Sequence, residues 1–481
     1  MTRYIAILLS ALSLGSCAEW LDVLPKTSVQ EKEMFNSEYG FKDVLTGFYI
    51  YMGDQELYGR SLTYGFLDIL ARRYDNSVVA SNLYNYENDY KLLKDAVWSK
   101  GYTLIANINN FLHFVDANSD VIRTPDYHDI MKGEALGLRA FIHFDLLRLF
   151  GPIYSENPGT VSICYRTKMD KYATPRLPAD QVADLVIEDL LAAEKLLDGT
   201  DNEQFGADEY NENRDPFLVL RQLRMNVWAV RAMLARAYLY KGDPASRKLA
   251  YDYAREVIDS PHFELAESNT DNRILFSEHI FSLHIYEMEK LMEGDFGMSG
   301  SDRLYVRQDT LDELYEKNAG YSTDFRQNSY YFQSSEGKFV LRKFDQSSYL
   351  GKYDGAEIMP LIRLSEMYYI AAECTTDAEE SADLINAVRH ARSIPESLDI
   401  QATNAYDASD VRPGYDSSKS VRINELMKEY RKEFYGEGQL FYFYKRHFYR
   451  TFFHCPLSAG MAAENYTPRL PDDEYIFGNN N

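Results

Sequence analysis

A cysteine near the start of the chain, Cys17, stands in a context that favours lipidation. Arg3 precedes an apolar stretch over residues 5–14, and the run Leu14-Gly15-Ser16-Cys17 follows. The stretch is too short to cross a bilayer as a helix, so it indicates the h-region of a signal peptide. Small residues before a cysteine suit a lipoprotein signal peptidase, because the thiol receives diacylglycerol before cleavage. We expect a lipoprotein signal peptide over residues 1–16 and a lipid anchor on Cys17; an ordinary secretory peptide is the alternative.

Two clusters of aromatic and polar residues have the composition of a carbohydrate site. Both fall where the sequence lacks helical periodicity. An aromatic ring packs on the C–H face of a sugar, while amides and carboxylates bond its hydroxyls. We expect at least one cluster to touch ligand, although any single Tyr could instead cover the helical half of the molecule. The candidate ligand-binding residues are Tyr74, Asp75, Asn76, Tyr84, Tyr86, Tyr330 and Tyr331.

Catalytic and metal-binding patterns are weak throughout the chain. Glycoside hydrolysis needs two carboxylates at a set separation, but 74 Asp and Glu residues make some such pair inevitable. His279 and His284 are five residues apart, which does not place both on one helical face. The sequence has no GxSxG motif, P-loop or Rossmann glycine pattern. We therefore expect no enzyme, no cofactor and no metal site; a helical glycoside hydrolase and a pure helical scaffold are the alternatives.

Charge and cysteine content exclude other classes. A net charge of -23 disfavours nucleic-acid binding, which requires Lys and Arg to neutralise phosphates. Beyond Cys17 the chain has Cys164, Cys374 and Cys455, an odd number without a CxxC motif. We expect these three to be small buried apolar residues. No later segment is long and apolar enough to span a membrane. No Pro/Gly/Ser run or charge block divides residues 17–481, which favours one large unit.

Helical periodicity dominates the elements that must position these residues. Apolar side chains at spacings of three and four predict helices over residues 98–115 and 133–150, the second ending at Gly151-Pro152. Residues 226–260 indicate a helical hairpin that turns at Asp243-Pro244 and roughly follows a tetratricopeptide pattern. Further helices are predicted over residues 362–373, 382–392 and 423–434.

The other stretches lack sustained helical period and are rich in Tyr, Asn, Asp, Ser and Gly. Alternation over residues 339–344 permits short strands. The fold class that we expect is mainly α, with tetratricopeptide-like hairpins in one half and an irregular, loop-rich half with short strands. Because long loops in a compact unit are often functional, we expect them to carry the site. These stretches are residues 58–92, 153–180, 262–355 and 394–420.

Several attractive side chains have a structural interpretation. Trp98 lies on the apolar stripe of its helix, so we expect it in the core rather than on a stacking platform. Asp145 and Arg148 are three residues apart and suit an ion pair. We expect them, with Glu134 and Arg139 on the same helix, to brace the structure rather than to catalyse a reaction.

Four blocks of sequence resemble the SusD/RagB family of nutrient-binding outer-membrane lipoproteins. The first follows Cys17 and includes residues 21–25 and 44–49, and the second is Trp98 with Tyr102, Ile105 and Asn107. The third and most specific lies within residues 133–151. The fourth comprises Arg363-Leu364-Ser365-Glu366, Ala372-Glu373, Asn386, Arg389, Arg392, Glu429, Glu433-Phe434 and Gly436-Glu437-Gly438.

The chain departs from the family pattern at a few positions. Gly137 stands where a bulky apolar residue is usual, and His143 where an aromatic residue is usual. Tyr430 replaces an expected Arg, and Leu440 and Phe443 replace a usual Arg and Asp. We interpret these as changes in packing and ion pairing.

The resemblance implies a function in nutrient uptake. Such a protein has an N-terminal SusD-like region, here about residues 17–220, and a C-terminal RagB/SusD region, here about residues 221–481. It is anchored by lipid in the outer membrane, exposed at the cell surface, and passes oligosaccharide without catalysis to a SusC-like TonB-dependent transporter. Some relatives bind peptides instead, which is the alternative ligand. The family motifs mark no ligand contacts, so no binding residue is carried over.

Overall fold

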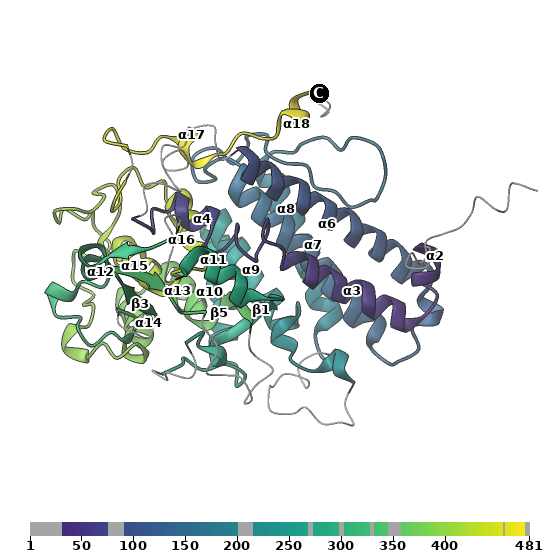
Figure 1. Ribbon diagram of the computed structural model, residues 1–481, viewed down its shortest axis with the longest axis horizontal. Coiled ribbons are helices and arrows are strands. Elements are labelled where there is room, and N and C mark those ends of the chain that lie inside the picture. Colours follow the sequence, from purple (N-terminus) through teal and green to yellow (C-terminus); the bar gives the residue numbers. More distant parts are fainter. Residues whose placement is uncertain are drawn as a thin grey trace, which may run out of the picture.

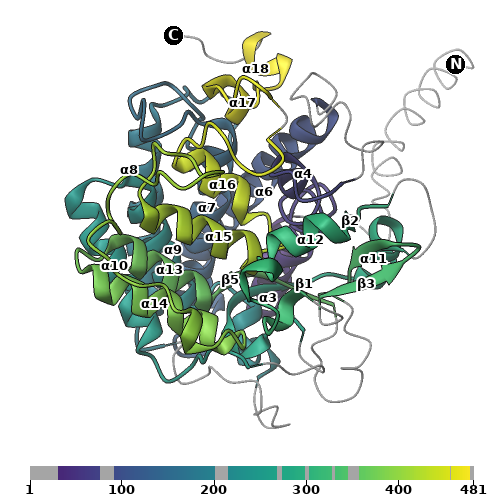
Figure 2. The ribbon, with the colours of Figure 1, turned by 90° about the vertical axis from the view of Figure 1, so that its left-hand side faces the viewer.

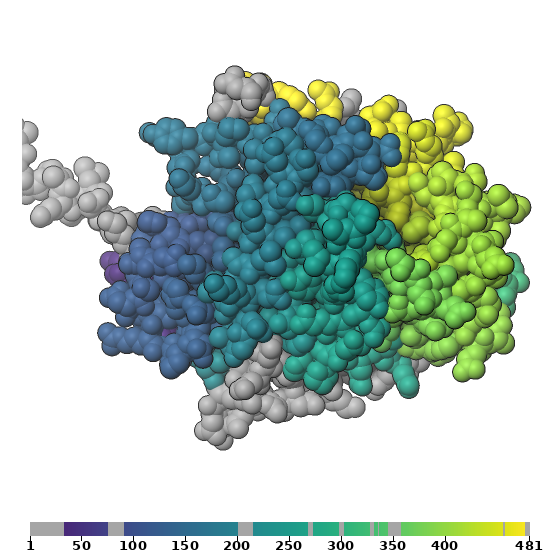
Figure 3. Space-filling model, turned by 180° about the vertical axis from the view of Figure 1, so that it is seen from behind, coloured from purple at the N-terminus to yellow at the C-terminus, as the bar shows by residue number. Residues whose placement is uncertain are grey.

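Long helices pack in succession to form one half of the molecule (Figure 1). The computed structural model describes residues 31–75, 91–200, 215–267, 273–297, 303–327, 331–344, 357–455 and 457–476. Each helix of the succession packs mainly on the next one along the chain. Figure 3 shows the outer face of this array, where the colours run across the surface in sequence order. The helices are α6 (Lys91–Ala117), α7 (Tyr127–Phe150), α8 (Ala179–Leu197), α9 (Val227–Lys241), α10 (Pro244–Ile258), α13 (Leu364–Cys374) and α14 (Ala378–Ala391).

The turn between α9 and α10 shows why the sequence signals were reliable there. Gly242 ends α9 with a φ of 73°, a left-handed conformation that glycine adopts without strain. The Asp243 side chain then accepts hydrogen bonds from the backbone N–H groups of Ala245 and Ser246, while Pro244 occupies the first helical position. The predicted hairpin over residues 226–260 is confirmed.

Two glycines of α7 allow neighbouring elements to approach closely. A Cβ atom built on Gly137 would lie 2.5 Å from Met225 Cγ, and one on Gly133 would lie 2.7 Å from Leu197 Cγ. Gly137 therefore departs from the family pattern because Met225 occupies the space that a bulky side chain would need. The other departure on this helix, His143, stacks on Tyr165 with ring centroids 3.9 Å apart. Burial lowers the pKa of His143 to about 3.

The second half of the molecule combines short helices with two small sheets (Figure 2). Strand β1 (His279–His284) pairs antiparallel with β5 (Ile358–Arg363), and β2 (Val306–Arg307), β4 (Lys338–Leu341) and β3 (Phe332–Ser335) form a three-stranded sheet in that order. The β3–β4 turn has positive φ at Glu336 and Gly337, as a two-residue type I′ turn requires. The strand expected near residue 340 is confirmed.

Other helices complete the fold, and a mainly α architecture is confirmed. Among the described residues, no helix is long and apolar enough to span a membrane. Cys164 and Cys374 are buried as expected, whereas Cys455 is only half-buried. The remaining helices are α2 (Glu31–Met34), α3 (Glu38–Met52), α4 (Phe66–Leu70), α11 (Met288–Phe296), α12 (Gln308–Leu314), α15 (Val421–Glu433), α16 (Gln439–Arg446), α17 (Ala463–Tyr466) and α18 (Asp472–Ile476).

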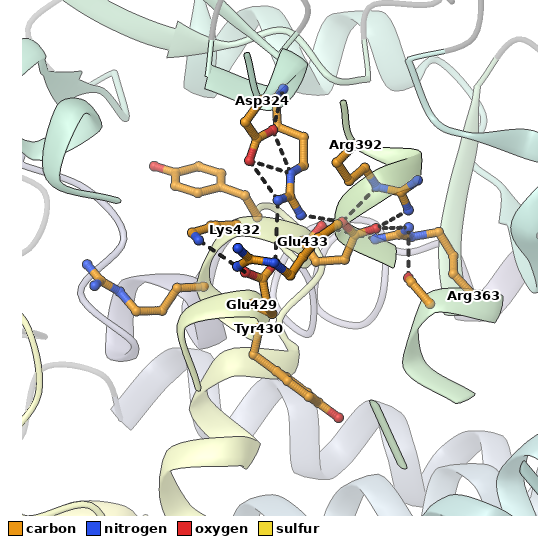
Figure 4. Close-up of polar contacts among 12 residues, drawn as sticks. Asp324, Arg363, Arg392, Glu429, Tyr430, Lys432 and Glu433 are labelled. Carbon is orange, nitrogen blue, oxygen red and sulfur yellow. Dashed lines mark hydrogen bonds and ion pairs between the residues drawn. The ribbon is translucent and has the colours of Figure 1, made fainter. Parts of the chain in front are cut away.

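A cluster of buried ion pairs joins the two halves (Figure 4). Glu433, at the end of α15, accepts hydrogen bonds from Arg363 at 2.6 Å, from Arg392 at 2.7 Å and from Arg326 at 2.6 Å. Glu278 bonds Arg363 and Arg392 from the opposite side, at 2.8 and 2.6 Å. All five side chains are fully buried.

The cluster continues along α15 and past its end. Glu429 pairs with Arg389 at 3.0 Å and with Lys432 at 3.1 Å. Glu437 pairs with Arg363 at 2.8 Å and also with Lys343. Because charges in a protein interior are tolerated only when they are paired and hydrogen-bonded, these contacts fix the geometry of every segment that they join.

The surrounding arginines lower the pKa of the Glu433 carboxyl. Burial raises the pKa of the Glu433 carboxyl, but Arg392, Arg363 and Arg326 more than offset this effect and hold it well below its usual range. The carboxylate therefore stays ionised in the folded chain down to strongly acidic pH. Its contribution to stability is fully present above the unfolded-state pKa of about 4.5 and is lost progressively as pH falls from there towards the folded-state pKa.

The polar residues of α7 also act as braces, as expected. Arg139 bonds Asp189 of α8 at 2.7 Å, and Glu134 pairs with Arg221 at 2.7 Å. Asp145 and Arg148 pair with each other. Trp98 of α6 is 5% exposed and packs edge-on against Phe150, with ring centroids 5.0 Å apart.

We predict that Glu433→Gln lowers the free energy of unfolding by about 3–5 kcal/mol, because it leaves buried guanidinium groups short of a counter-charge. Urea denaturation followed by circular dichroism measures the change. The matched control is Glu188→Gln on the exposed face of α8, which should alter stability by less than about 0.5 kcal/mol. An equal effect of the two substitutions would contradict the assigned role of Glu433.

Candidate functional site

The structure corrects the expectation that Tyr74 and Tyr331 reach ligand. Tyr74 is 5% exposed and donates its hydroxyl hydrogen to the carbonyl oxygen of Tyr64 at 2.8 Å. Tyr331 is fully buried, and the ammonium of Lys343 lies 4.8 Å from its ring centroid. Both rings therefore belong to the core, where the Tyr74 hydroxyl has a carbonyl partner and the Tyr331 ring packs against Lys343.

The two tyrosine-containing segments nevertheless meet in space. The rings of Tyr74 and Phe332 both pack edge-on against Tyr435, with centroid distances of 5.8 and 5.1 Å. The hydroxyl of Tyr435 donates a hydrogen bond to the carbonyl oxygen of Arg73 at 2.8 Å. Residues 72–75 and strand β3 therefore both pack on Tyr435, although they lie about 250 positions apart in the sequence. We call Tyr435 and the segment around it the base of the site.

Polar and aromatic groups reach the surface where these segments meet. Asp75 follows the buried segment, and its carboxylate accepts a hydrogen bond from the backbone N–H of Arg307 at 2.7 Å. The Arg307 side chain is 56% exposed and stands opposite Lys338 in the β2–β4 ladder. The ring of Tyr305 is half-buried, with the Lys338 ammonium 4.2 Å from its centroid. We call Asp75, Tyr305, Arg307 and Lys338 the loop junction.

Hydrogen bonds to residues at the end of α15 and just past it fix the position of the loop junction. Arg73 donates to the carbonyl oxygens at the end of α15, at Tyr430 and Arg431. The carboxylate of Asp68 accepts a hydrogen bond from the backbone N–H of Gly436 at 2.8 Å. Lys343, just after β4, bonds Glu437. Both sides of the loop junction are therefore fixed to the end of α15.

Burial sets the protonation of two of these groups. It lowers the pKa of Lys343 to about 8, although Glu437 opposes the shift. It raises the pKa of Asp68 to about 6, although the guanidinium of Arg73 opposes the shift.

The composition of the loop junction suits binding rather than bond cleavage. It offers the ring of Tyr305 and the cations Arg307 and Lys338, which can stack on a ligand and bond its hydroxyl groups. The side chain of Asp75 is 9% exposed and holds Arg307 in place. Glu429 and Glu433 are buried and paired with arginines, so they cannot reach a substrate. Among the described residues, no three His, Cys, Asp or Glu side chains are arranged to hold a metal ion.

Of the residues predicted from the sequence, Asp75 lies in the loop junction, whereas Tyr305, Arg307 and Lys338 were not among the candidates. The pairing of β2 with β4 identifies them. A strand as short as the two-residue β2 has no visible period in the sequence. The candidate ligand residues Asn76, Tyr84, Tyr86 and Tyr330, and the lipidation site Cys17, lie outside the described residues.

Asp68 generates a prediction about pH. Its carboxyl holds a proton up to about pH 6 in the folded chain, whereas in the unfolded chain it loses the proton near pH 4. Its contribution to stability should therefore fall as pH rises from about 4 to about 6, by at most about 3 kcal/mol. In Asp68→Asn this slope disappears, and urea denaturation at pH 4.5 and pH 7 measures it. The control is the exposed Asp383→Asn; identical pH profiles for Asp68→Asn and wild type would refute the assignment.

Comparisons with known proteins agree with this architecture. A model described as the SusD family matches residues 202–480, and a model described as starch-binding and associating with the outer membrane matches residues 19–239. The SusD-like protein P38 of Formosa agariphila is 27% identical over 198 residues. That match covers 40% of this chain and 36% of the relative, so it spans little more than a third of the relative's length.

Solved structures match over nearly the whole chain. A SusD superfamily protein from Bacteroides thetaiotaomicron has a TM-score of 0.69 at 20% identity, over 92% of this chain and 98% of that one. A protein solved with xylogluco-oligosaccharide has a TM-score of 0.63 at 15% identity, over 91% of this chain and 97% of that one. Because the first family model covers more than half of the sequence, the chain belongs to the SusD family.

Proposed function

We propose that the protein is a non-catalytic lipoprotein that captures oligosaccharide at the loop junction. Lipidated Cys17 anchors it at the outer membrane, facing the medium, and a SusC-like TonB-dependent transporter receives the ligand. The observation that carries the proposal is the loop junction itself: a half-buried tyrosine with a carboxylate and two cations on a rigid base. Family membership supports it, as does the structural relative that was solved with xylogluco-oligosaccharide.

The rigidity of the base supports ligand capture. A binding protein gains affinity when its contact groups are held in place before the ligand arrives, because less freedom is lost on binding. The pairing of Asp75 with Arg307 and of Tyr305 with Lys338 holds these side chains in place.

Calorimetry of the chain from Ala18 against neutral oligosaccharides and peptides tests ligand capture. We expect saturable oligosaccharide binding without product formation. Tyr305→Ala and Arg307→Ala should each weaken it at least tenfold, because each removes a stacking or hydrogen-bonding partner. The double variant Tyr84→Ala/Tyr86→Ala tests the sequence-based candidates in the same assay.

Tyr39→Ala is the control, since Tyr39 is 77% exposed on α3 and not part of the loop junction. Peptide binding without oligosaccharide binding would replace the proposal with peptide uptake. Release of shorter sugars from the oligosaccharide would show an enzyme.

The lipid anchor has its own test. Cys17→Ala should abolish fractionation with the outer membrane, because no thiol remains to receive diacylglycerol. Cells that express the variant are fractionated, and the protein is measured by immunoblot in each fraction. A variant that stays wholly in the outer-membrane fraction would contradict lipid anchoring.

A further inference from the structure

An open cleft lies between α6, the segment that joins α7 to α8, and the C-terminal α18. It has a volume of about 850 Å³, within the range of small-ligand sites. Figures 1 and 2 show α17 and α18 together at one end of the molecule. None of the residues of the loop junction lines this cleft.

One face of α6 forms a wall of the cleft. The lining residues of this helix recur at spacings of three and four, so they share that face. Tyr102 is half-buried there and donates its hydroxyl hydrogen to the carbonyl oxygen of Cys164 at 2.8 Å. Trp98 forms part of the floor, and its indole N–H donates to Glu474 of α18 at 3.1 Å. The α6 lining residues are Lys91, Asp95, Trp98, Ser99, Tyr102, Thr103 and Ala106.

The charged groups of the cleft are largely paired within its walls. Lys91 of α6 bonds Asp472 of α18 at 2.6 Å. Arg166 bonds both the carbonyl oxygen and the carboxylate of Asp170, at 3.0 and 3.3 Å. The pairs leave free lone pairs on the carboxylates and free N–H groups on the cations. Such pre-oriented donors and acceptors can bond a ligand that carries no charge.

The charge balance argues against anionic ligands. Five carboxylates line the cleft against two cations, so an anionic ligand would meet net repulsion. Lys91 and Arg166 hold only Asp472 and Asp170, and the other three carboxylates among the described lining residues pair with neither cation, so the repulsion does not extend to a cationic ligand. An uncharged ligand with many hydroxyl groups avoids the repulsion.

Exposed apolar side chains accompany the cleft. Among the described residues, twelve large hydrophobic side chains are exposed, and five of them lie within two positions of a lining residue. None of the five lines the cleft itself, so they are neighbours of its lining residues along the chain. Two of the five are tyrosines, which can stack on sugar rings. The five are Leu92, Met169, Tyr172, Tyr475 and Ile476.

We infer that this cleft is a second saccharide site, selective for uncharged oligosaccharides over those with uronate or sulfate groups. The inference rests on the proposed function, since both require that the protein binds oligosaccharide. The two sites share no residue, so substitutions separate them.

Thr103→Trp fills the cleft from its exposed wall and leaves the core contacts of Trp98 in place. Asn107→Trp is the matched control, because Asn107 is exposed on the same helix, one turn further on, and does not line the cleft. The wild-type chain from Ala18, both variants and Tyr305→Ala are titrated calorimetrically with neutral gluco- and xylo-oligosaccharides and with oligogalacturonate.

We expect Thr103→Trp to lose one of two binding events, or at least tenfold in affinity, while Asn107→Trp matches wild type and oligogalacturonate does not bind in the cleft. Unchanged binding by Thr103→Trp, with loss in Tyr305→Ala, would overturn the second site and leave the proposed function intact. The absence of oligosaccharide binding by wild type would overturn both.

Hydrogen exchange on the wild-type chain gives a measurement that does not depend on a folded variant. Saturating neutral oligosaccharide should slow exchange in peptides that cover residues 164–174 and 471–476. Unchanged exchange in both peptides at saturation would overturn the second site even if Thr103→Trp failed to fold.

Discussion

The constraint on which the rest of the structure depends is the charge balance around Glu433. Three guanidinium groups, from Arg326, Arg363 and Arg392, converge on this one carboxylate in a site without solvent. Guanidinium groups remain charged in proteins, so each must find an acceptor or the chain cannot bury it. The arrangement that satisfies all of them brings together β1, β5, α14 and α15, which are distant in sequence. A shift of any one of these elements would leave a buried charge unpaired. The cluster therefore favours this arrangement over alternative packings of the same elements.

The same cluster explains why the residues of the family pattern are not those at the surface of the loop junction. Arg363, Arg389, Arg392, Glu429 and Glu433 belong to the fourth block of resemblance, and every one is buried in the cluster. They hold the geometry of the fold and do not reach the surface of the loop junction. The loop junction is bonded to this cluster through Glu437 and Gly436 but has none of these side chains at its surface.

Sequence reasoning succeeded where local chemistry decides local structure. The Gly-Asp-Pro turn after α9 and the Gly-Pro stop after α7 follow from backbone preferences, and the helical period of α6 and α7 follows from one buried face. It missed α3, α8 and α16 as elements. In α16, the residues from Leu440 to Lys445 are all buried, so the helix has no polar face to reveal its period.

Tyr74 and Tyr331 were taken for ligand residues for a different physical reason. Composition cannot distinguish a tyrosine that meets water from one whose hydroxyl finds a carbonyl oxygen inside, and Tyr74 has such a partner in Tyr64. That partner is ten residues away and is fixed by a fold that the local sequence does not encode. Trp98 illustrates the converse: its helical stripe correctly predicted a core ring, yet its indole N–H bonds Glu474, 376 positions further on.

The two candidate surfaces differ in how their polar groups are held, and the difference bears on what each can recognise. At the loop junction, cations stand beside an aromatic ring. The guanidinium of Arg307 pairs with Asp75 and Asp309 at 3.7 and 3.4 Å, but its side chain is 56% exposed, so its remaining N–H donors are available to an acceptor on a ligand. In the cleft, Lys91 is bonded to Asp472 across the cleft and Arg166 to Asp170 on its own segment, so mainly the remaining lone pairs of these carboxylates are available to a ligand. A ligand that bonds both surfaces must supply acceptors to one and hydroxyl donors to the other. A hydroxyl group is both donor and acceptor, and a chain of sugars presents such groups along its whole length. An oligosaccharide therefore satisfies both surfaces with one repeating chemistry, whereas a ligand of fixed charge would satisfy at most one.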